Sequence, residues 1–338
     1  MKRLLLFVLV PAVVVGLVAA FALTSDSGYS TGPTREYLAL GNSLGYGYGA
    51  SDPATKGYVP LFRDFLESED AWDIDLLLNN LSVPGATSTS LISGPYPQLP
   101  TALAELAARN GDVGHENDVV VVTVDIGGND LLATLPACIG GPTPACFAAH
   151  DAVFATISTN LDYTLGELRA AAGPDTTMIV MTYYNSFVGV GCPYNALAWL
   201  GNLALEGNLA WGRPTGANDV IRSVAAAHNA KVAELVPGGE FPALLGPTNI
   251  LPDCVHANDS GYAIIADAFA DAHGLRGVGG MVELRVDNSL GPALQQSDTA
   301  SSSYYNVALA AAGIAVGAII ALAAGAWYAR RRWLGKSV

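Results

Sequence analysis

The stretch Val119–Val124, which reads Val-Val-Val-Val-Thr-Val, decides the fold of this chain because its β-branched residues follow one another without interruption. A run of this kind predicts a strand that is buried on both faces. On either side of it, between Arg35 and Leu275, strand-like and helical patterns alternate. This alternation predicts a parallel sheet with helices on both faces.

The expected elements follow from apolar periodicity and from the Gly and Pro residues at their ends. The predicted strands are Tyr37–Leu40, Ile74–Leu78, Asp118–Asp125 and Thr177–Tyr183. The predicted helices are Val59–Leu66, Leu99–Arg109, Ala152–Ala172, Asp219–Leu235 and Asp259–Ala272. Open parallel sheets bind ligands in the loops beyond the C-terminal ends of their strands, so we expect the functional residues there.

The composition excludes several classes of protein. Of the 338 residues, 51% are hydrophobic and only 14% are charged, so the bulk of the chain is not intrinsically disordered. Neither a G-X-Y repeat nor a heptad repeat occurs, which excludes collagen and coiled coils. The net charge is −14, and the region between the termini carries −20, because it holds all 30 acidic residues and ten of the 16 basic ones. A body this acidic repels phosphate groups, so we expect no nucleic acid as a partner.

Both ends of the chain carry long apolar segments. Residues 1–23 begin with Met1-Lys2-Arg3 and then become apolar, which predicts a signal peptide or an uncleaved anchor. The second run, Tyr305–Tyr328, is long enough as a helix to cross a bilayer, and Arg330-Arg331-Arg332 follows it. We therefore predict an exported domain at 34–275, a Gly/Ser-rich stalk at 276–304, a transmembrane helix at 305–328 and a basic cytoplasmic tail at 329–338.

Four cysteines fit a protein exported to an oxidising compartment, and they allow three disulfide pairings. Cys138 and Cys146 are eight residues apart in a Gly/Pro-rich loop and could pair locally, which leaves Cys192 with Cys254. No C-x-x-C pair occurs, and no two histidines form a metal-ligand pair. We therefore expect neither a metal ion nor another cofactor.

Four clusters at predicted strand ends carry chemically useful groups, and each also has an ordinary structural explanation. Ser43 follows the first strand between glycines, either as an exposed nucleophile or as a helix N-cap. Gly85 lies in a turn, where its amide could approach a substrate oxygen. Asn129 follows the Val-rich strand and either binds an oxyanion or caps the next helix. Asp253 and His256 can place a carboxylate against an imidazole that acts as a base.

Two further segments are rich in glycine or aromatic residues. Gly45–Gly49, which alternates Gly and Tyr, lacks the spacing of a nucleotide-binding loop, so we assign it no role from the sequence. An insertion at about Asn185–Gly216 carries Tyr194, Trp199 and Trp211. These aromatic residues either contact the substrate, by stacking on a sugar or lining an acyl groove, or pack in the core or in a lid.

The four clusters, in this order and each in its own strand-end loop, resemble the SGNH hydrolases, also called the GDSL esterase/lipase family. The resemblance covers about residues 35–275. Its motif blocks are matched by Gly41-Asn42-Ser43-Leu44, by Gly85, by Gly127-Gly128-Asn129-Asp130, and by Asp253 with His256. The resemblance implies an α/β fold, as a three-layer α/β/α sandwich with a mostly parallel, flavodoxin-like sheet.

The resemblance also implies a role for each matched residue. Ser43 is expected to be the nucleophile, His256 the base that takes its proton, and Asp253 the carboxylate that orients the imidazole. The backbone N–H groups of Ser43 and Gly85, together with the side chain of Asn129, are expected to form an oxyanion hole.

Two residues depart from the family pattern. Asn42 stands where an aspartate usually precedes the nucleophile, and Ala257 stands where a proline usually follows the histidine. The first change spares the triad, so the chemistry should survive it, whereas the second loosens the loop that carries His256. A disulfide between Cys192 and Cys254 would restrain that loop from the other side.

We therefore expect an exported serine esterase, anchored in the plasma membrane by its C-terminal helix with the catalytic domain outside the cell. Its expected substrates are carboxylic esters of lipids or O-acetylated sugars, cleaved through an acyl-enzyme intermediate. Thioesters and amides remain open as substrates, because the same triad serves acyl transfer in general. The alternative is a non-catalytic surface binding protein that retains the hydrolase fold.

Overall fold

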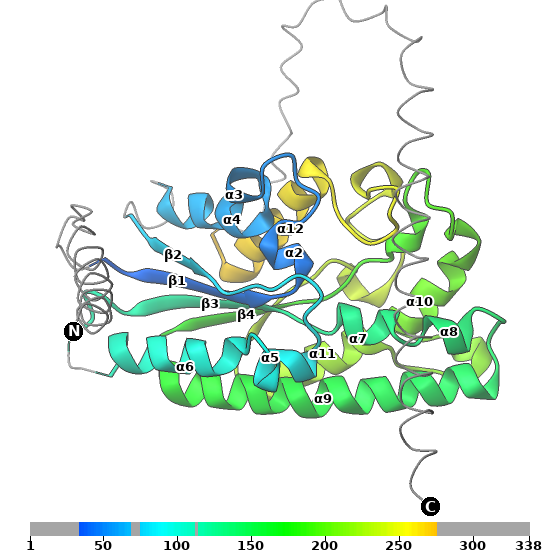
Figure 1. Cartoon of the computed structure of the whole chain (residues 1–338), viewed down its shortest axis with the longest axis horizontal. Helices are drawn as coiled ribbons and strands as arrows, with labels where there is room; N and C mark the ends of the chain where they lie inside the picture. Colours follow the sequence, from blue (N-terminus) through cyan, green and yellow to red (C-terminus); the bar gives the residue numbers. More distant parts are fainter. Residues whose placement is uncertain (1–33, 69–74, 112–113, 276–338) are drawn as a thin grey trace, which may run out of the picture.

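The computed structural model describes residues 34–68, 75–111 and 114–275 (Figure 1). Within these residues, one sheet has the strand order β2-β1-β3-β4-β5, and every neighbouring pair is parallel. Its strands are β1 (Glu36–Gly41), β2 (Leu77–Asn80), β3 (Val119–Asp125), β4 (Thr177–Met181) and β5 (Lys231–Ala233). The α/β class with a parallel sheet is confirmed.

Helices cover both faces of the sheet, which gives three layers (Figure 1). One layer consists of α3 (Pro53–Lys56), α4 (Tyr58–Glu67) and α12 (Asp259–His273). The other consists of α5 (Ser88–Ser93), α6 (Gln98–Arg109), α9 (Pro144–Ala172) and α11 (Ala217–Ala227). Near the C-terminal ends of the strands lie α2 (Ser43–Tyr46), α7 (Gly128–Leu132), α8 (Leu135–Cys138) and α10 (Ala198–Glu206). Short 3-10 turns are η1 (Ser186–Val188), η2 (Asn195–Leu197), η3 (Leu209–Trp211), η4 (Pro237–Gly239) and η5 (Pro247–Asn249).

The Val-rich strand β3 lies at the centre of the sheet, between β1 and β4. Its side chains are buried along nearly its whole length, because helices pack against both faces. The strand ends on Asp125, a fully buried carboxylic acid directly beside the end of β1. A charged residue type in this position is unusual, since buried carboxyl groups need hydrogen-bond partners.

The predicted helix Asp219–Leu235 is wrong in its second half. Helix α11 ends at Ala227, and the residues Lys231–Ala233 form β5 at the edge of the sheet. Asn229 has a φ of 51°, in the left-handed region, and this turns the chain from the helix toward the sheet. Strand β5 is too short to show an alternation of apolar and polar residues, so the sequence pattern does not distinguish it from the Ala-rich helix before it.

The second strand lies further along the chain than predicted. It is Leu77–Asn80 rather than Ile74–Leu78, and Ile74 lies outside the described residues. As an edge strand, β2 leaves its side chains partly exposed, so it accepts Asn79 and Asn80. The end of the apolar run therefore does not mark the end of the strand.

Helix α9 begins at Pro144, several residues before the predicted Ala152. The Thr143 side chain caps it by accepting a hydrogen bond from the Cys146 N–H, and Pro144 occupies the first helical position. Cys146 thus lies in the first turn of a helix rather than in a loop.

The predicted signal segment, stalk, transmembrane helix and basic tail lie outside the described residues. Among the helices of residues 34–68, 75–111 and 114–275, none is long and apolar enough to cross a bilayer.

Candidate active site

Ser43 is presented at the turn between β1 and α2. The N-cap of α2 is Asn42, whose side-chain oxygen accepts a hydrogen bond from the Leu44 N–H at 2.9 Å. Ser43 is therefore the first residue of the helix and is not needed as its cap. Its hydroxyl instead donates to His256 Nε2 at 2.9 Å.

His256 and Asp253 come from the loop directly before α12, far from Ser43 in the sequence. His256 Nδ1 lies 2.6 Å from Asp253 Oδ2, and the other carboxylate oxygen accepts the backbone N–H groups of Val255 and His256. Burial opposes ionisation of Asp253, but the hydrogen bonds from His256 outweigh it and hold the pKa of Asp253 below its usual value. An ionised Asp253 accepts the Nδ1–H, which leaves the Nε2 lone pair facing Ser43.

The three residues thus form one continuous chain of hydrogen bonds from Asp253 through His256 to Ser43. Such a chain can transfer the hydroxyl proton to the imidazole while the carboxylate balances the new positive charge. The structure brings together the three residues that the family resemblance singled out, although 213 positions separate His256 from Ser43.

Gly85 and Asn129 lie in the loops after β2 and β3. Gly85 has a φ of 82°, and no atom lies within 4 Å of the position where a Cβ would stand, so its backbone is open to an approaching group. Asn129 is not the cap of α7, because Gly127 takes that position. The Asn129 Nδ2 donates one hydrogen to the Ala86 carbonyl at 2.9 Å, and this bond uses one of its two hydrogens.

Asp130 joins the two loops that carry Gly85 and Asn129. Its carboxylate accepts both the backbone N–H of Ser88 at 2.9 Å and the Ser88 hydroxyl at 2.7 Å. Ser88 begins α5, directly after the Gly85 turn. The Asp of the Gly-Gly-Asn-Asp block therefore holds the two loops in register, a role that the sequence did not predict.

Asp125 anchors the turn that presents Ser43. It accepts the Asn42 N–H and the Tyr58 hydroxyl, each at 2.7 Å, and it also accepts the Gly45 N–H. A Cβ on Gly41 or on Gly45 would collide with its carboxyl group, which explains the two glycines on either side of Ser43. The only sequence signal for this role is the acidic residue that ends an otherwise apolar strand.

The Asn42 departure is accommodated within the same network. The Asn42 side chain donates to the Asp125 carbonyl at 3.2 Å and lies 2.8 Å from the Tyr183 hydroxyl, while its oxygen caps α2. An amide supplies both donors and an acceptor, which a carboxylate at this position does not. Asn42 therefore suits a turn that already has a carboxyl group, that of Asp125, beneath it.

Burial raises the pKa of Asp125 to about 7, although the hydrogen bonds from Asn42, Tyr58 and Gly45 oppose this rise. The folded state then binds more protons than the unfolded state between pH 3.8 and about 7, so Asp125 makes the protein less stable as the pH rises through that window. We expect the stability of the Asp125→Asn variant to depend less on pH there, with a difference in slope of up to about 1.4 kcal/mol per pH unit.

This prediction is checked by urea unfolding of both proteins at half-unit steps from pH 4.5 to pH 8. The substitution also weakens a hydrogen bond, which lowers the free energy of unfolding of the variant by a roughly constant amount at every pH. Only the slopes of the free energy of unfolding against pH are therefore compared. Parallel curves would show that Asp125 has an ordinary pKa.

An apolar cleft opens beside Ser43, with an empty volume of about 760 Å³ including open solvent. It is bounded by α7, α8, η1 and α10, and Ser43 and Asn129 both line it. Most of its surface is apolar, supplied by Leu131, Leu132, Leu135, Phe187, Leu200 and Ala204. A hydrocarbon chain attached to a carbonyl at Ser43 matches this lining.

The insertion at Asn185–Gly216 contributes to the cleft through Phe187 and through aliphatic residues of α10. None of the three aromatic residues singled out from the sequence, Tyr194, Trp199 and Trp211, lines the cleft. Trp199 packs edge-on against Trp211, with ring centroids 5.5 Å apart. It also packs against a small apolar cluster that contains Cys138 and Cys146. Packing is therefore the role of Trp199 and Trp211, while α10 supplies part of the cleft wall.

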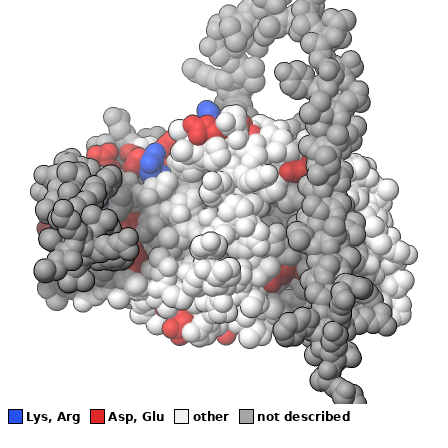
Figure 2. Space-filling model, viewed as in Figure 1, with Lys and Arg blue, Asp and Glu red and all other residues white. Residues whose placement is uncertain are grey.

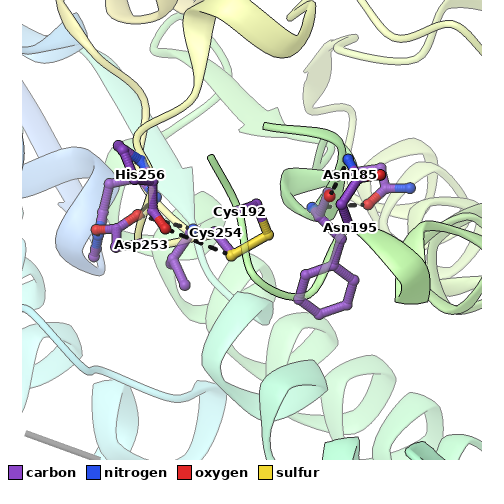
Figure 3. Close-up of a disulfide and its surroundings, with 9 residues drawn as sticks. Asn185, Cys192, Asn195, Asp253, Cys254 and His256 are labelled. Atoms are coloured by element: carbon purple, nitrogen blue, oxygen red, sulfur yellow. Dashed lines mark hydrogen bonds and ion pairs between the residues drawn. A yellow bond between two sulfur atoms is a disulfide. The ribbon is translucent and has the colours of Figure 1, made fainter. Parts of the chain in front are cut away.

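Both predicted disulfides, Cys138–Cys146 and Cys192–Cys254, are present. The second joins the His256 loop to the segment after η1, which Asn185 and Asn195 hold through side-chain hydrogen bonds to the backbone (Figure 3). A backbone bridge between Ile250 and Ala257 holds the same loop from within. These links compensate for the missing proline at Ala257.

Removal of the Cys192–Cys254 disulfide should cost more stability than removal of Cys138–Cys146. The two bonds close sequence separations of 62 and 8 residues, for which chain entropy gives about 4 and about 2.5 kcal/mol respectively. Only the double substitution Cys192→Ala/Cys254→Ala should also lower kcat, because it frees the His256 loop. Urea unfolding and steady-state kinetics of both double variants check this, and equal losses of kcat would contradict it.

One group of potential metal-ligand atoms occurs in the described residues, formed by Cys138, Cys146 and His150 within 4.8 Å of one another. The two sulfur atoms are bonded to each other and offer no thiolate. The donor set therefore does not fit a metal ion in this oxidised form.

Comparison with known proteins gives one family match. The model of the GDSL-like lipase/acylhydrolase family matches residues 39–264, which is more than half of the chain. That range contains the Ser43 turn, the Gly85 and Asn129 loops and the Asp253–His256 loop. A search of curated proteins finds no match.

Similar solved structures include three ester-cleaving enzymes. A lipase from a goat rumen metagenome is 19% identical, with 71% of this chain and 97% of that chain covered and a TM-score of 0.48. An extracellular lipase from Streptomyces rimosus is 21% identical, with 71% of this chain and 99% of that chain covered and a TM-score of 0.47. An acetylxylan esterase from Geobacillus stearothermophilus is 17% identical, with 72% of this chain and 95% of that chain covered and a TM-score of 0.42.

Proposed function

The chain belongs to the GDSL-like lipase/acylhydrolase family and is an ester hydrolase, and we propose that it cleaves carboxylic esters with Ser43 as the nucleophile. The observation that carries this proposal is the hydrogen-bonded chain from Asp253 Oδ2 through His256 to Ser43 Oγ. The same contacts favour an enzyme over a non-catalytic binding protein, because a binding surface does not need them.

In the first half of the reaction, Ser43 Oγ attacks the ester carbonyl while its proton passes to His256 Nε2. The carbonyl oxygen becomes an oxyanion, which the Asn129 Nδ2–H and the Ser43 and Gly85 N–H groups stabilise. The tetrahedral intermediate then expels the alcohol, which takes the proton from His256, and the acyl group stays on Ser43. Asp253 remains ionised throughout and balances the charge of the imidazolium.

In the second half, His256 takes a proton from a water molecule that attacks the acyl carbonyl. The carboxylic acid leaves, and the proton on His256 returns to Ser43 Oγ. Every proton transfer uses His256 Nε2, so this mechanism requires no metal ion or other cofactor.

The apolar cleft supports acyl groups longer than acetate as substrates. An acyl chain from Ser43 would run between Leu132 and Leu200, where burial of each CH₂ group is worth about 0.8 kcal/mol. We therefore infer that kcat/KM rises from acetyl to butyryl and octanoyl esters. The cleft offers an acetyl group few of these contacts, so short acyl esters are poorer substrates.

The experiment that tests this function has two parts, both on the soluble 34–275 fragment, which contains the described fold. A fluorophosphonate probe should label wild-type protein at Ser43, and peptide mass spectrometry identifies the site. Hydrolysis of p-nitrophenyl acetate, butyrate, octanoate and palmitate then gives the chain-length profile. If the folded fragment neither reacts with the probe nor hydrolyses any of these esters, the proposed function is wrong.

We also propose that the enzyme acts outside the cell and is held at the plasma membrane by Tyr305–Tyr328. The two disulfides support export, because such bonds persist in oxidising compartments. The full chain should fractionate with membranes, and protease added to intact cells should release its catalytic domain. A chain truncated at residue 304 should appear in the medium once the N-terminal segment is cleaved.

A further inference from the structure

The segment Gly45–Gly49, to which the sequence assigned no function, forms an aromatic surface beside the catalytic residues. Tyr46 and Tyr48 are 49% and 52% exposed, which is unusual for large aromatic side chains. Gly47 and Gly49 have φ values of 81° and 92°, in the left-handed region that other residues avoid. Exposed aromatic residues next to an active site indicate a contact surface for a ligand.

The backbone of this segment is fixed to the catalytic residues. The Tyr48 N–H donates to the Ser43 carbonyl at 2.8 Å, and the Tyr262 hydroxyl donates to the Tyr48 carbonyl at 2.6 Å. A Cβ on Gly49 would lie 3.3 Å from the Cβ of His256. Tyr48 therefore holds one position relative to both the nucleophile and the base.

The Tyr48 ring lies against the imidazole of His256, with ring centroids 4.6 Å apart and planes inclined by 45°. The His256 side chain is only 15% exposed, whereas about half of Tyr48 remains open to solvent. One part of the phenol ring thus covers the base, and the rest is available to a bound molecule.

The position of this ring relative to the cleft decides which part of an ester it meets. The residues that line the apolar cleft include Ser43 and Asn129 but neither Tyr48 nor His256. The alcohol portion leaves with the proton carried by His256 Nε2, so it lies on the His256 side of Ser43. The acyl chain therefore enters the cleft, and the alcohol portion meets Tyr48.

We propose that Tyr48 is a specificity-determining residue that binds the alcohol portion of the ester, and that this alcohol is an uncharged ring such as a pyranose. This inference rests on the proposed function. The exposed phenol face suits the flat apolar face of a sugar ring, and its hydroxyl can bond a sugar hydroxyl. The visible surface around α2 carries few charged side chains and no cluster of basic ones that would bind a phosphate headgroup (Figure 2).

The test compares two esters that share an acyl group, methyl 6-O-octanoylglucopyranoside and ethyl octanoate. The Tyr48→Leu variant should raise KM for the sugar ester about fivefold to tenfold and change kcat/KM for ethyl octanoate less than about threefold. Tyr48→Phe keeps the ring and loses only the hydroxyl, so its KM for the sugar ester should rise less than that of Tyr48→Leu. The matched control is Tyr163→Leu, which removes an equally exposed tyrosine from α9 on the opposite layer.

Two results would overturn the proposal. If Tyr48→Leu lowers kcat equally on both esters, Tyr48 only positions His256. If Tyr48→Leu changes neither ester more than Tyr163→Leu does, the ring has no part in recognition.

A binding measurement keeps this inference separate from the proposed function. Saturation-transfer NMR with the Ser43→Ala protein should show transfer to the ring protons of methyl glucopyranoside, and Ser43→Ala/Tyr48→Leu should lose it. Glycerol, an uncharged alcohol without a ring, should show little transfer to its protons. Absence of transfer to the sugar overturns the inference even if the esters are hydrolysed. If no ester is hydrolysed, the proposed function fails, while the NMR result still decides the role of Tyr48.

Discussion

Ser43→Ala should lower kcat for p-nitrophenyl butyrate about 10⁴- to 10⁶-fold, because no other group replaces the attacking oxygen. His256→Ala should cause a loss of similar size, since Ser43 Oγ donates to His256 Nε2 at 2.9 Å and would have no base without it. The double variant should be no slower than either single variant, because the two residues act as one unit. Steady-state hydrolysis, with the fluorophosphonate probe as a check on residual wild-type enzyme, measures all three.

The control for these variants is Ser93→Ala, which removes a hydroxyl from the last turn of α5, outside the described site. It should retain wild-type kcat. Losses for Ser43→Ala and His256→Ala that multiply in the double variant would mean that the two residues act independently. That outcome would contradict the shared proton transfer, even if both single losses were large.

Asn129→Ala should lower kcat about 10²- to 10³-fold, the usual effect of removing one oxyanion donor. KM should change little, because the donor acts on charge that develops only in the transition state. The Asn129 Nδ2 also bonds the Ala86 carbonyl, so circular dichroism and urea unfolding must show that the variant is folded. Asn208→Ala, at an exposed position outside the cleft, is the matched control.

A transition-state analogue separates the electrostatic role of Asn129 from a structural one. An alkyl boronic acid forms a tetrahedral adduct on Ser43, and its inhibition constant should weaken in the variant in step with the fall in kcat/KM. Substrate analogues that stay planar should bind equally well to both proteins. Equal weakening for planar and tetrahedral ligands would show that the substitution merely disturbs the site.

The sequence predicted the parallel sheet because the evidence for it is local. The run Val119–Val124 and its neighbouring strands carry their own periodicity, and a strand buried on both faces needs no other information to be recognised. The short edge strand β5 escaped prediction because three residues after an Ala-rich helix have no periodicity of their own. The edge strand β2 was shifted for a related reason, since its exposed side chains are not uniformly apolar.

The roles of the residues that support the site also could not be predicted from the sequence. Asp125, Asp130 and Tyr48 act through contacts with the backbone or with His256, and no spacing along the chain announces such contacts. The sequence signals were weak: Asp125 ends an apolar strand, Asp130 belongs to a family motif block, and Tyr48 lies in a Gly/Tyr segment, but none of these signals indicated the contact. The three aromatic residues singled out in the insertion gave a misleading signal, since none of them lines the cleft, whereas Phe187 and aliphatic residues of α10 do.

By itself, the sequence placed Ser43 and Asn129 after predicted parallel strands, and hence at one edge of the sheet. Asp253 and His256 lie before α12, about twenty residues after β5, and only the family resemblance grouped them with Ser43. Tertiary structure alone decided their relative positions, because the 2.9 Å hydrogen bond between His256 Nε2 and Ser43 Oγ links residues 213 positions apart in the chain. It also decided that Ser43 lines the apolar cleft whereas the Tyr48 ring does not. The position of a cavity depends on how helices such as α10 pack, and packing is a property of the whole fold.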